Sequence, residues 1–157
     1  LWETATGLPV RRFSGDPAET TGVILSKDGK FLLTTSTGGS AKLWNVTTGD
    51  TLSTLKSDSP ILCADMTPDA KYCITGHSNR KVLVWEVATQ KILSTYPLEK
   101  NPKTVSISGD GKLACSTQRS SSIEVWDATT GKRTQQIKED FLVWCACLTH
   151  DGKHIVA

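Results

Sequence analysis

Apolar and polar residues alternate in short runs along the chain, and each run leads into a tight-turn sequence. Val23 and Leu25 show this period of two, and Val105 and Ile107 show it again about 80 residues later. A period of two predicts a β-strand. The pair Asp28-Gly29 follows the first run, and because glycine accepts a positive φ it predicts a tight turn. No segment shows a sustained 3.6-residue period, so the pattern predicts no helix.

The whole pattern recurs with a period of about 41 residues. Four tryptophans are spaced 42, 41 and 41 residues apart: Trp2, Trp44, Trp85 and Trp126. Two other markers have the same period. One is an Asp-Gly-Lys turn that begins at residues 28, 69, 110 and 151, with Ala70 in place of glycine in its second copy. The other is a Thr-Gly pair that begins at residues 6, 48, 89 and 130, with Gln90 in place of glycine in its third copy. Three independent markers with one period establish an internal repeat, which must be recognised before the fold is predicted.

Each repeat is expected to hold four short strands. One strand precedes the Asp-Gly turn, the second follows it, the third ends at the tryptophan and the fourth follows the Thr-Gly turn. Expected second strands lie at 31–35, 72–75, 113–117 and 154–157, third strands at 41–44, 82–85 and 123–126, and fourth strands at 8–13, 51–55, 92–96 and 133–137. A four-stranded antiparallel sheet cannot bury both faces alone, and radial stacking of such sheets predicts a β-propeller.

The predicted fold class is therefore all-β, a β-propeller of four-stranded antiparallel blades. We divide residues 1–157 into a partial blade at 1–16, repeats at about 17–57, 58–98 and 99–139, and a partial blade at 140–157. These amount to about four blades, at the low end of the usual four to eight. We expect either further blades in a longer native polypeptide or, if the chain is complete, a homodimer that pairs two copies into a larger ring.

The segment Ile123–Lys132 carries a family resemblance, because it reads Ile-Glu-Val-Trp-Asp-Ala-Thr-Thr-Gly-Lys. With the 41-residue period and four strands per unit, it resembles the WD-repeat (tryptophan–aspartate) β-propellers. The resemblance covers essentially the whole chain. It implies a propeller that binds other proteins and carries no catalytic site of its own.

The repeats are divergent members of that family at two positions. Where the family has a histidine before the first strand, this chain has acids, and the aspartate before the third strand is missing: the acids are Asp16, Asp58, Glu99 and Asp140, and the missing aspartates fall at Gly38, Asn79 and Ser120. In the family these groups form a buried hydrogen-bond network with the tryptophan and a serine or threonine. We expect that the full network cannot form, while Thr34, Thr75 and Ser116 can still bond the tryptophan indoles.

Composition narrows the classes of function. The chain is 38% hydrophobic and 22% charged, which favours a folded protein, and its formal net charge is +2. That balance argues against a nucleic-acid binder, and no apolar run reaches the ~18 residues of a membrane span. Five cysteines, an odd number, favour a reducing compartment, so we expect an intracellular protein, cytoplasmic rather than nuclear.

Candidate catalytic and metal-binding side chains lack a supporting arrangement. Cys145, Cys147, His150 and His154 are spaced somewhat like metal ligands, but the repeat register indicates that these cysteines are packing substitutions. His77 occupies the position of Ser36 and Gln118 and is expected to be a solvated turn residue. No nucleophile motif or phosphate-binding glycine loop is present. We expect no catalytic residue, no metal site and no cofactor.

The predicted function is a non-catalytic scaffold that binds proteins or peptides on the propeller face. The candidate partner-binding residues lie in loops that the register places at one end: Asp58, Arg80, Glu99, Arg119 and Phe141. Mixed charge suits protein recognition, although an ordinary solvated rim has the same composition. The alternatives are an enzyme whose catalytic residues lie in blades absent from this chain, and a recognition module for histone or other peptide tails.

Burial is predicted to differ within the third strands. The side chains of Trp44, Trp85 and Trp126 should be buried between blades, while Lys42 and Glu124 on the same strands should tolerate alanine. Trp144 breaks the repeat pattern, and we expect it to fill a gap between blades.

Overall fold

The computed structural model describes residues 1–157 and contains fourteen strands. It contains no helix that is long and apolar enough to cross a bilayer. Twelve strands form three four-stranded antiparallel sheets and the last two form a hairpin, and the predicted all-β fold of antiparallel blades is confirmed. The sheets are β1–β4 (Thr20–Leu25, Phe31–Ser36, Ser40–Asn45, Thr51–Lys56), β5–β8 (Ile61–Met66, Tyr72–His77, Lys81–Glu86, Lys91–Pro97) and β9–β12 (Thr104–Ile107, Leu113–Thr117, Ser120–Asp127, Arg133–Val143), followed by β13 (Cys147–Leu148) and β14 (Ile155–Val156).

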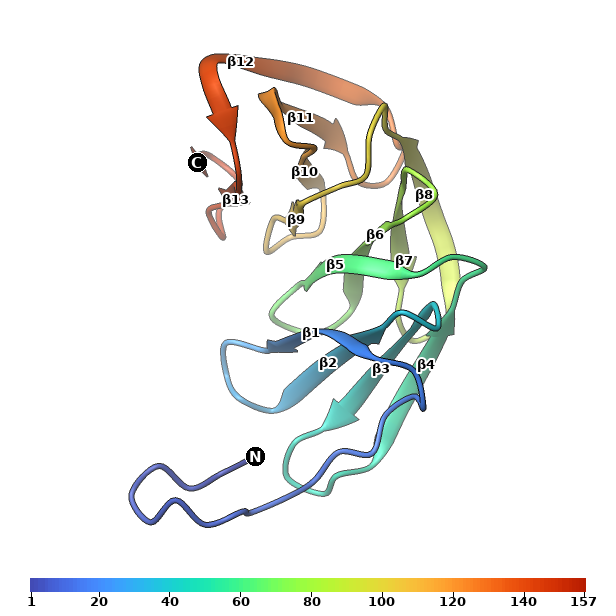
Figure 1. Ribbon diagram of the computed structural model, residues 1–157, viewed down its shortest axis with the longest axis vertical. Helices are drawn as coiled ribbons and strands as arrows, with labels where there is room; N and C mark the ends of the chain where they lie inside the picture. Colours follow the sequence, from blue (N-terminus) through green and yellow to red (C-terminus); the bar gives the residue numbers. More distant parts are fainter.

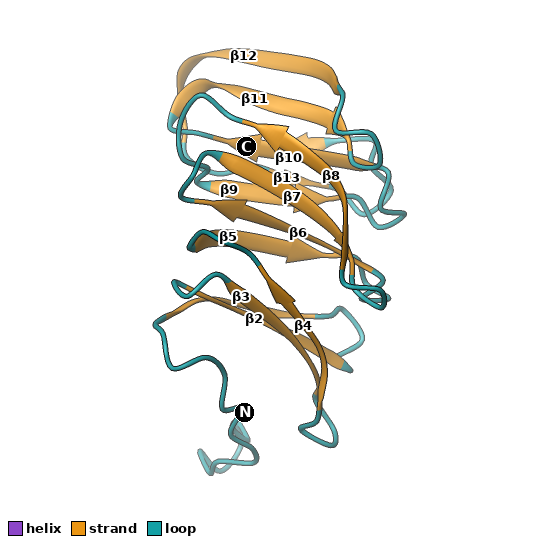
Figure 2. Ribbon diagram, turned by 90° about the vertical axis from the view of Figure 1, so that its right-hand side faces the viewer, coloured by secondary structure: helices purple, strands orange, loops and turns teal.

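The sheets stack side by side along an arc rather than a closed ring (Figure 1). The first strand of each sheet, β1, β5 or β9, lies on the inner side of the arc, and β13 continues this row. The fourth strands β4, β8 and β12 form the outer side, which faces the viewer in Figure 2. We refer to the three complete sheets as blades 1, 2 and 3.

Apolar clusters between neighbouring blades hold the arc together. One cluster joins blades 1 and 2 and includes Leu33, Leu55 and Trp85, and a second joins blades 2 and 3 and includes Tyr96 and Trp126. The Tyr96 and Trp126 rings stack with centroids 4.5 Å apart. Trp85 and Trp126 therefore lie inside the contacts between blades, and the burial of each contributes several kcal/mol to stability.

A hydrogen bond from a serine on the fourth strand accompanies each apolar contact. The Ser53 hydroxyl donates to the Val87 carbonyl oxygen at 2.9 Å, and Ser94 donates to the Ala128 carbonyl oxygen at 2.5 Å. Both acceptors lie just after the tryptophan of the next blade. We call these two bonds the serine clasps.

The fourth strand predicted at 8–13 is wrong, because this segment has only one bridge, between Trp2 and Pro9. Its backbone bonds mainly to Leu1, whose carbonyl oxygen accepts from the N–H groups of Val10 and Arg11. The segment nevertheless follows the course of a fourth strand: Arg11 donates to the carbonyl oxygens of residues 47 and 48, and the Phe13 and Trp44 rings meet edge to face at 5.7 Å.

β12 is longer than the predicted 133–137 strand, and it includes Phe141, for which the register predicts a loop. It pairs with β11 at Ser122↔Lys138 and again at Ser120↔Val143, so residues 139–142 bulge out between these pairs. The bulge turns the strand toward β13 and exposes its side chains.

Candidate functional site

The tryptophan network is built differently in each blade. The Trp44 indole N–H donates to Thr34 Oγ1 at 2.9 Å, and the Trp85 indole N–H donates to Thr75 Oγ1 at 2.8 Å. The third expected bond is absent, because Trp126 Nε1 and Ser116 Oγ are both buried without a partner. Threonine has a branched β-carbon that restricts its hydroxyl to few rotamers, whereas serine can turn its hydroxyl away from the indole.

His77 is not the solvated turn residue that its position suggested, since it is only 1% exposed. Its Nδ1 lies 3.2 Å from the Ser59 carbonyl oxygen, which can only accept, so Nδ1 carries the proton. Its Nε2 lies 2.8 Å from Thr75 Oγ1 and accepts from that hydroxyl. The chain Trp85–Thr75–His77–Ser59 is therefore a buried network of another kind, which uses a histidine of the second strand in place of the family's histidine before the first strand.

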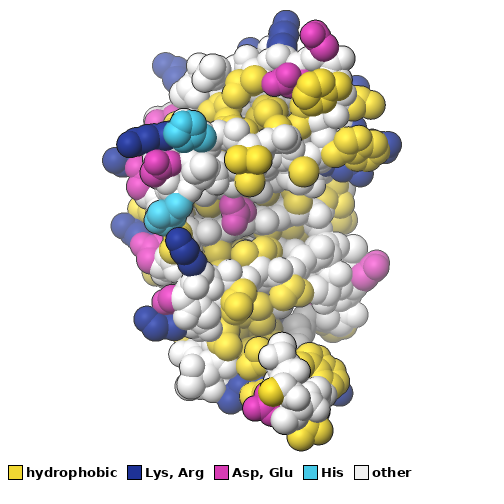
Figure 3. Space-filling model, turned by 90° about the vertical axis from the view of Figure 1, so that its left-hand side faces the viewer, with side chains coloured by type: hydrophobic (Ala, Val, Ile, Leu, Met, Phe, Trp, Pro, Cys, Tyr) yellow, Lys and Arg dark blue, Asp and Glu magenta, His cyan; other side chains and the backbone are white.

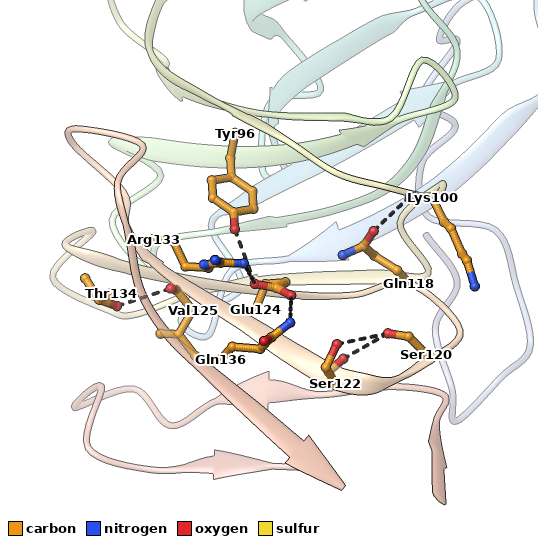
Figure 4. A network of polar contacts seen from close by, with 10 residues as sticks. All are labelled: Tyr96, Lys100, Gln118, Ser120, Ser122, Glu124, Val125, Arg133, Thr134 and Gln136. Atoms are coloured by element: carbon orange, nitrogen blue, oxygen red, sulfur yellow. Dashed lines mark hydrogen bonds and ion pairs between the residues drawn. The ribbon is translucent and has the colours of Figure 1, made fainter.

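The residues equivalent to His77 also join the second strand to the incoming connection. Ser36 contacts the Ser40 hydroxyl at 3.1 Å, which in turn donates to Asp16 Oδ2 at 2.6 Å. Gln118 Oε1 accepts from the Lys100 backbone N–H at 2.9 Å, as seen in Figure 4. The hydrogen bond from Ser40 helps to hold the pKa of Asp16 below its usual value. In all three blades, the end of the second strand is therefore hydrogen-bonded to the connection that enters the blade, but through a different side chain each time. We call this place the corner of the blade.

That corner belongs to the end of the blades at which Gly39, Arg80 and Arg119 form the β2–β3, β6–β7 and β10–β11 turns. We call it the arginine end, and the end with the Asp-Gly turns the opposite end. The predicted partner-binding residues are all exposed, four of them on connections at the arginine end and the fifth on β12: Asp58, Arg80, Glu99, Arg119 and Phe141. Their role in binding stays a prediction.

Backbone hydrogen bonds tie these connections together. The Leu98 N–H donates to the Arg80 carbonyl oxygen at 2.8 Å, and the Lys100 N–H binds the side chain of Gln118, the neighbour of Arg119. The stretch 98–100 thus bridges two arginine turns on successive blades. One short segment of chain therefore links the two turns, through a backbone carbonyl on one and the Gln118 side chain on the other.

Both arginines adopt a backbone conformation that favours glycine. Arg80 has a φ of 62° and Arg119 a φ of 52°, while Gly39 holds the equivalent turn of blade 1 with a φ of 79°. A residue with a side chain is strained there by about 1 kcal/mol or more. The repeat register aligns Arg80 with Gly39, and a glycine at this turn position is the sequence signal that could have revealed its strain. Arg119 lies two residues before the aligned position, which is Ser121, so the register gives no such signal for it.

Trp144 lies on the surface instead of filling a gap between blades, because 59% of it is exposed. The Arg119 guanidinium stacks over its ring at 4.8 Å. The equivalent residues Leu62 and Lys103 are exposed as well, although their blades have a neighbour on both sides. Exposure at this position is therefore shared by blades 2 and 3, whereas the equivalent Thr21 of blade 1 is half-buried. Leu142, which no sequence pattern singles out, is 57% exposed beside it.

Glu124 is also placed differently from the expectation of an exposed residue. It is 5% exposed, and its carboxylate accepts from Tyr96, Arg133 and Gln136 at 3.3, 3.3 and 2.7 Å (Figure 4). Tyr96 belongs to blade 2 and the other residues to blade 3. The carboxylate therefore links two blades and cannot be lost without leaving its partners unpaired.

The cysteines do not gather with other potential ligands, and no group of three or more His, Cys, Asp or Glu side chains has the geometry to hold a metal ion. Cys73 and Cys115 are fully buried, which fits packing substitutions. Burial raises the pKa of Cys115 to about 12. Cys145 and Cys147 are exposed, so the packing interpretation is wrong for these two.

The inner face of the arc carries hydrophobic side chains at both of its ends (Figure 3). Beside β1, a hollow of about 460 Å³ is lined by seven hydrophobic residues among twelve, including Trp2, Phe13, Val23 and Leu25. Trp2 is 66% exposed there, unlike the three buried tryptophans. On the same row of inner strands, Asp65 accepts from Ser106 Oγ and the Ile107 N–H, both at 3.0 Å, and burial raises its pKa.

Comparison with known proteins agrees with this architecture. The family model described as "WD domain, G-beta repeat" matches residues 7–45 and 49–86. No curated protein matches the chain. The two matched segments end at Asn45 and Glu86, each one residue after a buried tryptophan, and they share the period seen in the structure. The chain therefore belongs to the WD-repeat family.

Proposed function

We propose that this chain is a non-catalytic scaffold whose arginine end binds protein or peptide partners. WD repeats generally mediate interactions between proteins. The observation that carries the proposal is the convergence of connections from successive blades, which brings exposed charged side chains to one end and places Arg119 against the exposed Trp144. Exposed aromatic residues and arginines are the side chains that most often anchor protein interfaces.

Two other functions are tested by different measurements. An enzyme with its catalytic residues in blades outside this chain would be found by an activity screen of the longer polypeptide. A module for basic tails would use acids on the inner strands, and the Asp65 carboxylate is already engaged by Ser106 and Ile107. The second alternative is therefore less favoured than binding at the arginine end.

Paired charge reversals test the proposal. Arg80→Glu with Arg119→Glu should reduce the amount of each genuine partner recovered in quantitative affinity purification, mainly by slowing association. The control reverses two exposed lysines at the opposite end, Lys30→Glu with Lys112→Glu, and should leave recovery unchanged. If only the control pair lowered recovery, the opposite end would be the binding surface and the proposal would be wrong.

A further inference from the structure

A patch of positive charge covers the arginine end of blades 2 and 3. The connections β6–β7, β8–β9 and β10–β11, with the first residue of β7, carry five exposed cations and one acid: Arg80, Lys81, Lys100, Lys103 and Arg119, with Glu99. None of them takes part in the three ion pairs of the structure, which involve Lys30, Lys112 and Arg133. In Figure 4 the Lys100 ammonium points away from Gln118, to which its backbone is bonded.

Charge changes sign along the same end of the arc. The corresponding connections that enter blades 1 and 2, at 14–19 and 57–60, carry three acids and no cation: Asp16, Glu19 and Asp58. Glu139 and Asp140 bound the basic patch on its β12 side. The patch is therefore a local feature of blades 2 and 3, between acidic neighbours.

Two of these cations have a strained backbone with positive φ. Arg80, with a φ of 62°, holds the left-handed position that Gly39 holds in blade 1, and Arg119, with a φ of 52°, is left-handed at another position of the equivalent turn of blade 3. Glycine would remove the strain at both sites. Strained residues of this kind concentrate at binding sites, and here the same costly choice occurs twice on neighbouring blades.

Arg119 is also oriented for an anion. The centre of its guanidinium lies 4.8 Å from the centroid of the Trp144 ring. Its N–H groups take part in none of the ion pairs of the structure, so they are available to bind a carboxylate in two-pronged fashion. Trp144, which contacts this guanidinium, is 59% exposed, and Phe141 and Leu142, which precede it within three residues of the chain, are 62% and 57% exposed. They offer an apolar contact surface directly beside the charge.

We propose that the basic patch and the Phe141–Trp144 segment bind an extended peptide that combines glutamate or aspartate with large apolar residues. Its carboxylates would pair with Arg119 and Arg80, while its apolar side chains cover Phe141, Leu142 and Trp144. This inference rests on the proposed scaffold function and specifies the chemistry of the partner.

The test uses a labelled twelve-residue peptide of alternating Glu and Leu, titrated with the 157-residue chain by fluorescence polarisation. Arg119→Gly and Arg80→Gly should each weaken binding about tenfold, since one charged hydrogen-bonded contact is lost. The same two variants should raise Tm, because glycine relieves the left-handed strain. A residue with only a structural role would not show loss of binding together with gain of stability.

Gln90→Gly is the matched control. Gln90 has a φ of 60° in a turn at the opposite end, where the other repeats have glycine. It should raise Tm by a similar amount and leave peptide affinity unchanged. Arg119→Lys keeps the charge but removes the planar guanidinium fork, and should lose affinity while gaining no stability.

Other ligands separate this inference from the proposed function. A Gln-Leu peptide should bind at least tenfold more weakly than the Glu-Leu peptide, and a phosphoserine-Leu peptide or a twelve-nucleotide single strand should bind no better than the Glu-Leu peptide. Preferential binding of either would overturn the carboxylate assignment. Unchanged Glu-Leu affinity in Arg80→Gly and Arg119→Gly would overturn this site, and the scaffold function would stand if natural partners were still lost on charge reversal.

Discussion

At the residue scale, the buried tryptophans differ in whether a hydroxyl side chain accepts a hydrogen bond from the indole N–H. Thr34 and Thr75 accept from the indoles of blades 1 and 2, while Ser116 and Trp126 remain unpaired in blade 3. A buried polar group without a partner costs about 1–3 kcal/mol. Blade 3 therefore lacks a hydrogen bond that blades 1 and 2 both make, and their threonines show which side chain could supply it.

We predict that Ser116→Thr stabilises the protein by about 1 kcal/mol, because the branched side chain directs its hydroxyl toward Trp126 as in the other blades. Urea unfolding followed by circular dichroism measures the change. Ser116→Ala is the control, since it removes the unpaired hydroxyl without supplying an acceptor. If threonine were no better than alanine, the missing bond would not be the cause of the defect.

His77 should make stability depend on pH. Burial lowers the pKa of its imidazole from the ordinary 6.5, so the folded state binds this proton less readily than the unfolded state. Its contribution to stability is complete above pH 6.5 and is lost as the pH falls below 6.5 toward the lowered pKa. The free energy of unfolding, measured between pH 7.5 and 5, should fall more steeply for the native chain than for His77→Gln. Equal slopes would contradict the assigned network.

At the element scale, strands are held by contacts that cross from one blade to the next. Glu124 on β11 illustrates this, because its carboxylate receives Tyr96 from β8 together with Arg133 and Gln136 from β12. Tyr96 in turn stacks on Trp126. The polar and apolar contacts of this interface therefore share side chains, and a change at one is felt by the other.

We predict that Glu124→Ala lowers the free energy of unfolding by about 2 kcal/mol, since charged hydrogen bonds are lost and Tyr96 loses its acceptor. Lys42→Ala, at the equivalent position of blade 1, should change it by less than about 1 kcal/mol, because Lys42 is only partly buried and makes one hydrogen bond, to Gly15. Chemical denaturation of both variants measures the difference. Equal losses would mean that the Glu124 network adds no stability.

The stability lost when a tryptophan is replaced by alanine should depend on where the tryptophan lies in the arc, and not on the sequence motif around it. Trp85→Ala should cost about 3–5 kcal/mol, since its ring is 3% exposed within the apolar cluster of blades 1 and 2. Trp2→Ala should cost less than about 0.5 kcal/mol, since its ring is 66% exposed. Thermal unfolding of the two variants measures this contrast, and similar losses of stability would contradict the assigned burial.

At the scale of the whole molecule, the face of blade 1 differs from the matching faces inside the arc. Val23 and Leu25 are 66% and 56% exposed, whereas the equivalent Val105 and Ile107 are each 6% exposed against blade 2. These positions are therefore built to pack on another sheet, and the hollow beside β1 continues this apolar surface.

We predict that the 157-residue chain self-associates through this face as its concentration rises. Light scattering should show a mass above that of the monomer, and Val23→Lys with Leu25→Lys should lower it to the monomer value. Leu52→Lys, on the outer strand β4 where the side chain is 49% exposed, should not. A monomer at all concentrations would exclude self-association through blade 1.

Much of the fold could be predicted from the sequence because the period of 41 residues keeps the strands and turns of the three complete blades in step, although it did not predict the extension of β12 to Val143. What could not be predicted depended on tertiary contacts. The pattern does not show that His77 reaches Ser59, that Glu124 is covered by Tyr96, or that the hydroxyl of Ser116 turns away from its indole. The arginine end followed from register alone, but the stacking of Arg119 on Trp144 required coordinates.

The serine clasps bear on how such a chain can evolve. In both, the donor is a side chain of one blade, but the acceptor is a backbone carbonyl of the next, at Val87 and at Ala128. Every residue has such a carbonyl, so the receiving blade needs no particular side chain. A gene segment encoding one unit can thus be duplicated, deleted or exchanged without breaking the joint. The loop sequences of each repeat can then change independently, while the hydrogen bond between neighbouring repeats is kept.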